Sequence, residues 1–397
     1  MNDPASSVGS GHAFVAVAIS VLSAACVGAL PSPPQPVPDP QVALLPNPSV
    51  NSDRNPFLTP PRVTPSDAIL DSRWARHPVI AERTERWIDY WTSEGAGEFA
   101  LYLTRMTRFS SLIDAEISAR ELPRSLRYLP IVESGYSPAA QSSAGAVGLW
   151  QFMSGTAREV GLAVGPLVDE RRDPVRSTPK ALSLLSSHRG RFESWYLALA
   201  AYNAGPGRIS RLLRRHAALA ARGDSLYVVL HGLLPSETRD FIPKLLAASA
   251  LACSPERYGF EPQQVPPFRF EEVTVPDATS VDVIARVAEV SQDLIEALNP
   301  QLLRGFTPAN RETPVRVPPG QGAVFRRNYA LVPPDERVSF LEHKVVSGET
   351  FGHIALRYGV PLDVLRAANP SIQPRLLQIG HWLIVPRAPT IPWTRDE

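Results

Sequence analysis

The sequence predicts a multidomain protein in which a mainly α-helical domain precedes two small units of strand, helix, helix and strand. Between about residues 67 and 253, apolar residues recur at steps of three and four, and no convincing run of alternating strand residues occurs. After residue 260 the chain changes to short Val- and Pro-bounded strands around helices, and one stretch recurs about seventy residues further on. The 397 residues are enough for two or three domains with a sizeable core.

The N-terminus predicts export. Residues 13–25 form an apolar run that is too short to span a bilayer comfortably and is typical of a signal peptide within residues 1–29. Cys26 follows directly, in a context that resembles the lipobox at which bacterial lipoproteins are acylated. Ser23 departs from that pattern, because a branched apolar residue is usual there, and no Lys or Arg precedes the run. We expect a periplasmic protein that is lipid-anchored to the outer membrane through Cys26. The alternatives are cleavage after residues 27–29 to a soluble form and an uncleaved anchor.

Residues 30–65 are dense in proline and poor in aromatic residues. Such a composition has no core of its own and predicts an extended spacer between the anchor and the folded domains. A disordered tail without a function fits the same composition.

The composition argues against several classes of function. Forty Lys and Arg residues face 39 Asp and Glu residues, and the net charge of +1 gives no electrostatic reason to expect binding to nucleic acid. The two cysteines, Cys26 and Cys253, form neither a zinc pattern nor a disulfide framework. We expect no metal and no organic cofactor. If Cys26 is acylated, Cys253 is left unpaired and is predicted to be a small core residue in a helix over Leu245–Cys253.

The helical domain is predicted element by element. Its first apolar stripe consists of Phe99, Tyr102, Leu103, Met106, Phe109, Ile113 and Ile117. Pro123 fits the first turn of the next helix, which we expect to end at Glu133. Further helices are expected at about 154–160, 179–188, 193–203, 206–217 and 236–253. Thr178 would cap the second of these helices, with Pro179 in its first turn.

The repeated unit predicts two copies of one small fold. Residues 282–300 align with residues 352–370, and each copy ends in a short strand, at 315–318 and at 383–386. In the second copy we expect a strand over 344–346, a helix that Gly359 caps, and a second helix that starts at Pro361.

One carboxyl group is placed as a catalytic acid would be. The apolar run Leu129–Val132 leads to Glu133 and stops at once in Ser134-Gly135. A carboxyl group at the end of an apolar segment is partly desolvated, which favours the neutral form that a general acid needs near neutral pH. A Glu at the end of a helix is usually just solvated, so this signal is weak by itself.

Two further clusters point to the same site. Small residues from Ser142 to Gly148 let the backbone come close to a ligand, and Leu149–Met153 supplies an aromatic wall with one amide, Gln151. A later helix ends in Tyr202-Asn203-Ala204-Gly205, where side chains can project into a cleft. An Asn there is usually a cap and a Trp-Gln pair is usually core, but the three clusters together favour an enzyme site.

The order of these motifs resembles a known family. The matching stretches are Pro130–Ser134, Ala146–Met153, Asp169–Pro174, Ala200–Gly205 and Leu234–Arg239. The region from Trp74 to Ala252, within a domain expected at 66–258, resembles the lytic transglycosylase domain of the membrane-bound lytic murein transglycosylase D family. That domain has a lysozyme-like fold of the α+β family and cleaves peptidoglycan. The two repeats, expected at 268–320 and 341–387, resemble LysM modules, which bind glycans that contain N-acetylglucosamine.

The resemblance implies roles for the site residues. Glu133 would protonate the glycosidic oxygen and then take the proton of the muramic C6 hydroxyl, which leaves a 1,6-anhydromuramoyl end. Ser134 would bond near Glu133 or the N-acetyl group, and Gln151, Tyr202 and Asn203 would hold the sugar. Gly148, Trp150 and Phe241 complete the expected substrate contacts.

Phe241 is also a departure, because the family usually carries a tyrosine there. Its loss removes one hydrogen-bond donor, worth about 0.5–1.5 kcal/mol, and puts the tuning of Glu133 in doubt. A hydrolytic muramidase of the same fold and a non-catalytic wall-binding scaffold are therefore the alternatives. Asp169, Glu170 and Asp173 could supply a second carboxylate, but capping and ion pairing are the better interpretation.

The second LysM-like module carries the expected glycan groove. Its two loops consist of Gly348, Glu349, Thr350 and Phe351, and of Asn369, Pro370, Ser371 and Ile372. Purely structural turns remain an alternative for these residues. The first module has no Gly-Glu-Thr turn, so its sequence supports glycan binding less strongly, and a degenerate module is the alternative.

Overall fold

The computed structural model describes residues 67–165, 167–216, 223–308, 311–338, 340–369 and 372–386. All of them belong to one structural unit, Thr64–Glu397. The signal peptide, Cys26, the proline-rich spacer, Pro370 and Ser371 lie outside the described residues, and their predictions stay predictions. In the described part of the chain, no helix is both long and apolar enough to cross a membrane.

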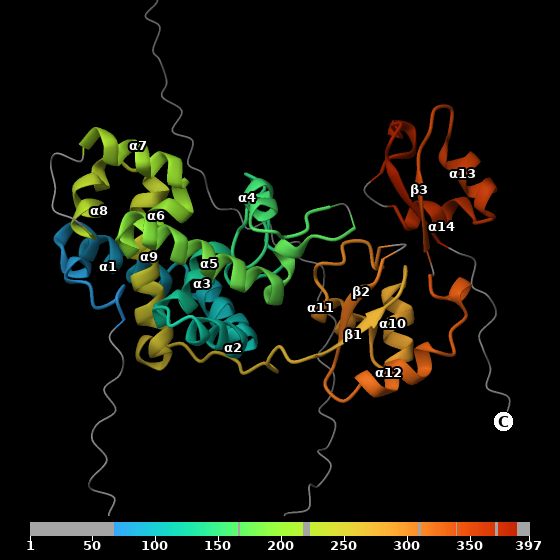
Figure 1. Ribbon diagram of the computed structural model, residues 1–397, viewed down its shortest axis with the longest axis horizontal. Helices are drawn as coiled ribbons and strands as arrows, with labels where there is room; N and C mark the ends of the chain where they lie inside the picture. Colours follow the sequence, from blue (N-terminus) through green and yellow to red (C-terminus); the bar gives the residue numbers. More distant parts are fainter. Residues whose placement is uncertain are drawn as a thin grey trace, which may run out of the picture. The chain divides into compact units, whose positions relative to one another are not determined.

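The first region is helical (Figure 1). Its first half consists of η1 Arg73–Arg76, α1 Pro78–Thr92, α2 Ala96–Ala119, η2 Arg124–Tyr128, α3 Leu129–Ser134, α4 Ser154–Glu159 and η3 Glu170–Arg172. Its second half consists of α5 Pro174–Phe192, α6 Trp195–Ala204, α7 Pro206–His216, α8 Ser225–Leu230, η5 His231–Leu233, α9 Ser236–Cys253 and η6 Pro255–Tyr258. Most of the predicted helices are therefore confirmed.

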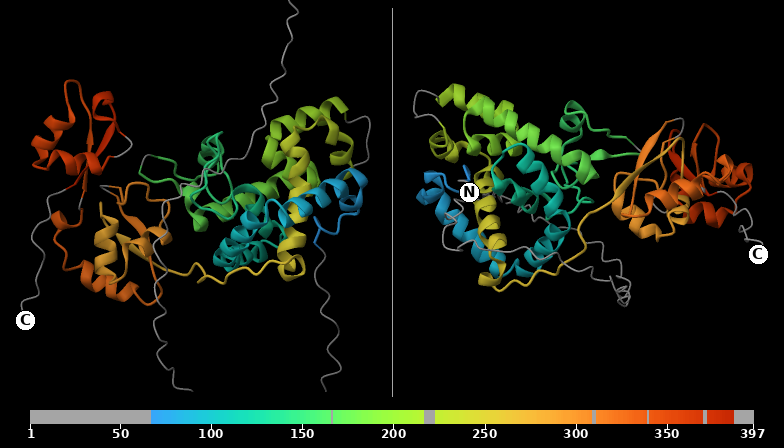
Figure 2. Two further views of the ribbon diagram at one scale, coloured as in Figure 1. Left: turned by 180° about the vertical axis from the view of Figure 1, so that it is seen from behind. Right: turned by 60° about the horizontal axis from the view of Figure 1, so that its bottom comes forward.

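Helix α9 lies in the middle of this region and packs against α1, α3 and α6. Figures 1 and 2 show it passing among the other helices. Its buried face includes Phe241, Leu245 and Ala248, which share one hydrophobic cluster with Phe99 and Leu199 from other helices. The helix therefore brings its polar first turns close to the short helix α3.

Helix α5 corrects the prediction for 179–188. It begins at Pro174, and Asp173 caps it by accepting hydrogen bonds from the backbone N–H groups of Val175 and Arg176. Pro179 is inside the helix, and Thr178, the predicted cap, donates its hydroxyl to the carbonyl of Pro174. The sequence holds two possible starts, and the Asp-Pro start prevails because a carboxylate satisfies two backbone donors at once.

Cys253 corrects a second prediction. It is the last residue of α9 and its side chain is exposed, so it is not a core residue. The helix ends at this position, while the buried stripe of its last turns ends at Leu251. The predicted helix is confirmed, but the prediction that Cys253 faces the core is wrong.

Two small units follow the helical region and an extended segment (Figure 2). The first consists of β1 Glu271–Val275, α10 Val281–Val287, α11 Gln292–Leu298 and β2 Thr313–Val317, followed by α12 Gly322–Tyr329 and η7 Pro334–Glu336. The second consists of β3 Phe340–Lys344, α13 Phe351–Tyr358, α14 Leu362–Ala367, η8 Pro374–Leu376 and β4 Trp382–Pro386. The predicted order of elements is confirmed in both copies, and α12 is an element that the repeat did not predict.

Each unit is built on one antiparallel strand pair. Val273 lies opposite Val315 in the first pair, and His343 lies opposite Leu383 in the second. The strand predicted over 344–346 is wrong in its bounds, because β3 ends where that strand was expected to begin. After Lys344 the chain leads into a turn at Gly348, which has a positive φ of 84°. Gly359 caps α13 as predicted, in the left-handed conformation.

Candidate active site

Glu133 lies in the last turn of α3. Gly135 ends this helix in the left-handed conformation, with φ of 57°, and a Cβ atom there would lie 2.1 Å from the ring of Tyr102. Only glycine fits both the backbone angle and the space. The helix therefore stops directly after the acid, and Glu133 keeps part of its surface accessible while α9 packs beside it.

Burial raises the pKa of Glu133 to about 8. Two smaller effects are included in this value: the negative charge of Glu237 raises the pKa, and the positive charge of Lys244 lowers it. The carboxyl group therefore carries a proton at neutral pH, which is the state that the apolar run before it predicts. A protonated carboxyl group in a desolvated site can act as a general acid.

Tyr202 comes close to this acid from the end of α6. Its hydroxyl donates a hydrogen bond of 2.8 Å to the carbonyl of Trp150, and its ring meets Phe152 edge to face. Burial raises its pKa well above the usual value, and the charge of Glu133 adds to this shift. The phenol therefore stays neutral and fixes the wall of the site.

Asn203 is held by the first turn of α9. Its amide nitrogen donates to Oε1 of Glu237 at 3.1 Å, and its amide oxygen accepts from the hydroxyl of Thr238 at 2.7 Å. It is thus a link between two helices rather than a helix cap. Through it, Glu237 is held near Glu133.

The loop over 145–152 forms another wall. Gln151 has a positive φ of 47°, and its side-chain nitrogen donates to the carbonyl of Gly148 at 2.9 Å. A Cβ atom at Gly148 would lie 1.8 Å from the carbonyl oxygen of Arg171. The guanidinium of Arg171 donates to the carbonyls of Gly145 and Phe152 at 3.0 and 3.2 Å. Arg171 therefore fixes the loop that carries Gln151.

Ser134 joins α3 to the same loop. Its hydroxyl donates to the carbonyl of Leu149 at 2.9 Å and lies 3.2 Å from the carbonyl of Pro130. The structure therefore shows Ser134 bonded to backbone carbonyls rather than to Glu133, and its expected contact with a sugar stays a prediction. The hydroxyl instead holds the loop against the helix that carries Glu133.

Three expected substrate contacts are corrected by burial. Trp150 is fully buried and donates its indole N–H to the hydroxyl of Thr178 at 3.0 Å. Phe241 is 3% exposed and belongs to the core, and Gly148 is buried against Arg171. These residues support the site from behind, because aromatic and small residues of a motif fit a core as well as a surface.

Two charged residues of the site were not expected. Glu237 and Lys244 lie on α9 at a spacing of seven residues, so both are on one helix face. The ammonium of Lys244 lies 4.3 Å from the centroid of the Trp87 ring, and burial lowers its pKa. Their spacing in the sequence indicates that they share a helix face, but it does not indicate that this face meets α3.

The alternative carboxylates have structural partners, as predicted. Asp169 pairs with Arg171 at 2.7 Å, and Oε2 of Glu170 accepts from the backbone N–H of Ala163 at 2.7 Å. Asp173 caps α5 and pairs with Arg316 at 2.7 Å.

Comparison with known families matches three parts of the chain. Residues 111–224 match the transglycosylase SLT domain, residues 269–333 the LysM-like domain of the lytic transglycosylase MltD, and residues 343–386 the LysM domain. The chain contains an SLT domain followed by two LysM-type domains. The SLT match includes Glu133, Gln151, Tyr202 and Asn203. With the helical region and the two strand pairs, this confirms the predicted fold class.

Membrane-bound lytic murein transglycosylase D from Escherichia coli K12 is 30% identical over 269 residues, which are 65% of this chain and 59% of that protein. Its counterpart in E. coli O6:H1 gives the same values. The chain thus spans about three fifths of the length of these relatives. Among solved structures, the 70 kDa soluble lytic transglycosylase SLT70 from E. coli is 29% identical over 36% of this chain and 24% of its own, with a TM-score of 0.32.

Six of the expected glycan residues of the second LysM domain, at β3–β4, are described, and four of them make contacts within the domain or are buried in it. Glu349 bonds to His343 at 2.7 Å and accepts from the backbone N–H of Val346 at 2.9 Å. Thr350 caps α13, and Phe351 is 2% exposed.

Asn369 is buried in the same domain and is bonded to the backbone of Leu365 and Ile384. These contacts are structural, so the structure corrects direct glycan contact for Phe351 and Asn369. Gly348 is exposed and Ile372 is half-buried.

Proposed function

We propose that this chain is a peptidoglycan lytic transglycosylase that cleaves the β-1,4 bond between N-acetylmuramic acid and N-acetylglucosamine. The observation that carries the proposal is the partly accessible carboxyl group of Glu133, whose pKa burial raises to about 8 inside the region that matches the SLT domain. The relatives that match over most of this chain are named lytic murein transglycosylases, which supports the same substrate.

Glu133 performs both proton transfers. In the first step its carboxyl group gives a proton to the glycosidic oxygen, and the N-acetylglucosamine unit leaves with that oxygen as an alcohol. In the second step the Glu133 carboxylate takes the proton of the muramoyl C6 hydroxyl while O6 bonds to C1. The acid is regenerated, no water is consumed, and a 1,6-anhydromuramoyl end remains.

This reaction suits a site with one acid because the nucleophile belongs to the substrate. An intramolecular hydroxyl reacts at a high effective concentration and needs no positioned water. The side-chain nitrogen of Gln151 donates to the carbonyl of Gly148, so its amide oxygen can accept a hydrogen bond from the N–H of a sugar N-acetyl group. The Tyr202 hydroxyl can accept a hydrogen bond from a sugar hydroxyl while it donates to Trp150.

Hydrolysis is the second candidate, and one observation favours it. Glu237 is close enough to raise the pKa of Glu133, so the site holds two carboxyl groups. A water-using muramidase needs such a pair. Glu237 accepts a hydrogen bond from Asn203, which ties it to the helix junction. We therefore assign it an electrostatic role rather than that of a base.

We further propose that the protein is exported and held at the outer membrane by acylated Cys26. The apolar run before Cys26 supports this placement. In cell fractionation, Cys26→Ala is expected to move the protein from the membrane fraction to the soluble periplasmic fraction. Retention of this variant in the membrane fraction would contradict the lipid anchor.

The catalytic role of Glu133 is tested by replacing its carboxyl group. Glu133→Gln keeps the size of the side chain but cannot transfer a proton, so release of muropeptides from purified peptidoglycan should fall by at least about a thousandfold. Glu82→Gln, at an exposed position of α1, is the matched control and should keep full activity. Activity of Glu133→Gln within tenfold of the unaltered protein would exclude the proposed role.

A further inference from the structure

We propose that the first LysM-type domain, at β1–β2, is a support of the active site. It is fixed to the SLT domain through Arg316 and thereby positions the loop that carries Gln151. Arg316 is then a positioning residue, because it acts through Asp173 and does not contact the reacting atoms. The proposal goes beyond the function proposed above and rests on it only where activity is measured.

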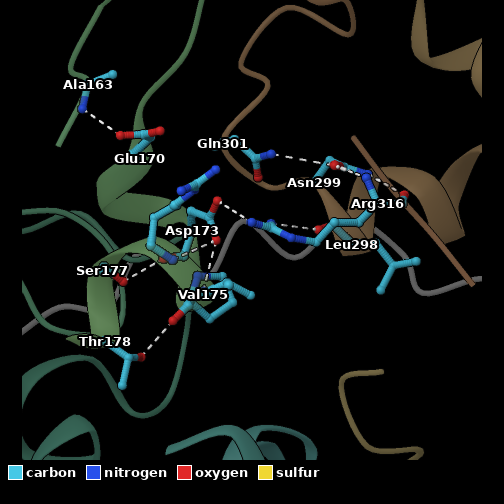
Figure 3. Close-up of polar contacts among 12 residues, drawn as sticks. Ala163, Glu170, Asp173, Val175, Ser177, Thr178, Leu298, Asn299, Gln301 and Arg316 are labelled. Atoms are coloured by element: carbon cyan, nitrogen blue, oxygen red, sulfur yellow. Dashed lines mark hydrogen bonds and ion pairs between the residues drawn. The ribbon is translucent and has the colours of Figure 1, made fainter. Parts of the chain in front are cut away.

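The first observation is a buried ion pair between the two domains. Nη2 of Arg316, on β2, donates to Oδ2 of Asp173 at 2.7 Å, and the two side chains are only 3% and 2% exposed (Figure 3). The guanidinium carbon also lies 5.1 Å from the centroid of the Phe270 ring. A buried charge that loses its partner is strongly destabilising, whereas a paired one is tolerated. The pair therefore ties the two domains to one arrangement.

Backbone contacts surround this pair. The N–H of Asp169 donates to the carbonyl of Gln301, and the N–H of Leu303 donates to the carbonyl of Leu167, both at 2.9 Å. Val168 and Leu302 form an antiparallel bridge between these bonds. Leu298, the last residue of α11, belongs to the hydrophobic cluster of the SLT domain. The contact thus combines charge, backbone pairing and apolar burial.

The loop between α11 and β2 makes most of these contacts. Its counterpart in the second LysM domain is the loop that begins at Asn369. Asn299 and Asn369 stand at equivalent places and make the same bonds, each donating to two carbonyls and accepting from the backbone N–H of the following strand. The fold is therefore conserved between the two copies, while the loop of the first copy is used to hold the SLT domain.

The segment over 169–173 connects this contact to the active site. On one side it meets the LysM-type domain through Asp169 and Asp173. On the other side, Arg171 donates to the carbonyls of Gly145 and Phe152, and its own carbonyl lies against Gly148. Asp169 holds the Arg171 guanidinium through two bonds of 2.9 and 2.7 Å. A shift of this segment would therefore move the loop that presents Gln151.

A double-mutant cycle in the whole protein tests the ion pair. Arg316→Met keeps the apolar stem, and Asp173→Asn keeps a residue that caps helices well, so each variant removes charge with little other change. Each single variant should lower the urea midpoint of unfolding, and the double variant should lose clearly less than the sum of the two. Arg286→Met, at an exposed position of α10, is the control and should keep the midpoint. Additive losses would refute the coupling.

Two readouts test positioning in the same variants. In Arg316→Met, amide hydrogen exchange of residues 145–152 should become at least fivefold faster, while exchange in α9 stays unchanged. On soluble glycan strands, kcat/KM should fall at least fivefold, because the displaced loop carries the sugar contact of Gln151. Unchanged exchange of the loop would overturn the proposal even if stability falls. The exchange result does not need activity, so it also decides the matter if the protein cleaves no peptidoglycan and the proposed function fails.

Discussion

At the residue scale, helix α9 places one negative and one positive charge, Glu237 and Lys244, near the carboxyl group of Glu133. Glu237 raises its pKa and Lys244 lowers it, on top of the larger effect of burial. In the proposed mechanism the catalytic form is the protonated one, so activity should be present below about pH 8 and should be lost as the pH rises through the pKa of Glu133. Charge changes on α9 should move this limit without changing Glu133 itself.

The two charges predict shifts in opposite directions. Glu237→Gln removes a negative charge, so the pKa of Glu133 falls and the alkaline limit of kcat/KM should move down by roughly half to one pH unit. Lys244→Met removes a positive charge, and the limit should move up by a similar amount. The pH profile of cleavage measures both. Shifts of the same sign, or no shift in either variant, would contradict the assignment of these charges.

Glu133 was predictable from the sequence because an apolar run and an abrupt stop are local signals. Glu237 and Lys244 were not, because their effect depends on α3 and α9 meeting across about a hundred residues of chain. Trp150 and Phe241 were predicted to face the sugar and are buried instead. A motif shows which residues belong to a site, but it does not show which of them face the ligand and which fill the core behind it.

At the element scale, the loop over 145–152 depends on close backbone packing. Gly145 and Gly148 have nearly the same positive φ, 85° and 87°. A Cβ atom at Gly145 would meet nothing within 4 Å, whereas one at Gly148 would lie 1.8 Å from the carbonyl oxygen of Arg171. A side chain at Gly145 would therefore introduce backbone strain alone, whereas one at Gly148 would introduce strain and a collision.

Substituting alanine at each glycine tests this difference. Gly145→Ala should cost about 1–2 kcal/mol of stability, which is the usual penalty for a left-handed non-glycine residue, and should keep most of the activity. Gly148→Ala adds a collision with backbone and should cost about 1–3 kcal/mol more, with activity reduced at least about tenfold. Thermal unfolding and muropeptide release measure both effects. Equal losses in the two variants would show that Arg171 does not brace the loop.

The elements themselves were largely predictable, and the errors have identifiable causes. The period of the apolar residues indicated most helices, and the repeat indicated both strand pairs. The start of α5 was misplaced because Asp173-Pro174 and Thr178-Pro179 are both valid start signals. The contact between Asp173 and Arg316 could not be read from either segment, because the two residues lie 143 positions apart.

At the scale of the whole molecule, the second LysM domain has a hydrophobic cluster of its own. Its members, including Val345, Ile354 and Val385, are separate from the clusters of the SLT domain and of the first LysM-type domain. We propose that this domain binds glycan and acts as a tether, because binding at a second site raises the concentration of substrate at the first. The first LysM-type domain, in contrast, shares Leu298 with the core of the SLT domain.

Ending the chain after Arg337 removes only the tether. Cleavage of insoluble peptidoglycan should then fall at least about tenfold, since effective concentration is lost, while cleavage of soluble glycan strands stays within about twofold. Sedimentation with purified peptidoglycan should show the loss of binding directly. Unchanged binding and cleavage of the insoluble polymer would contradict glycan recognition by this domain.

The most direct test of the proposed chemistry is the mass of the products formed in water labelled with heavy oxygen. Muropeptides released from purified peptidoglycan should be about one water lighter than hydrolysed ones and should carry no label, because O6 of the substrate closes the ring in place of water. Glu133→Gln should release none of them. Labelled reducing ends would instead show hydrolysis, would make Glu237 the candidate base, and would contradict the single-acid mechanism.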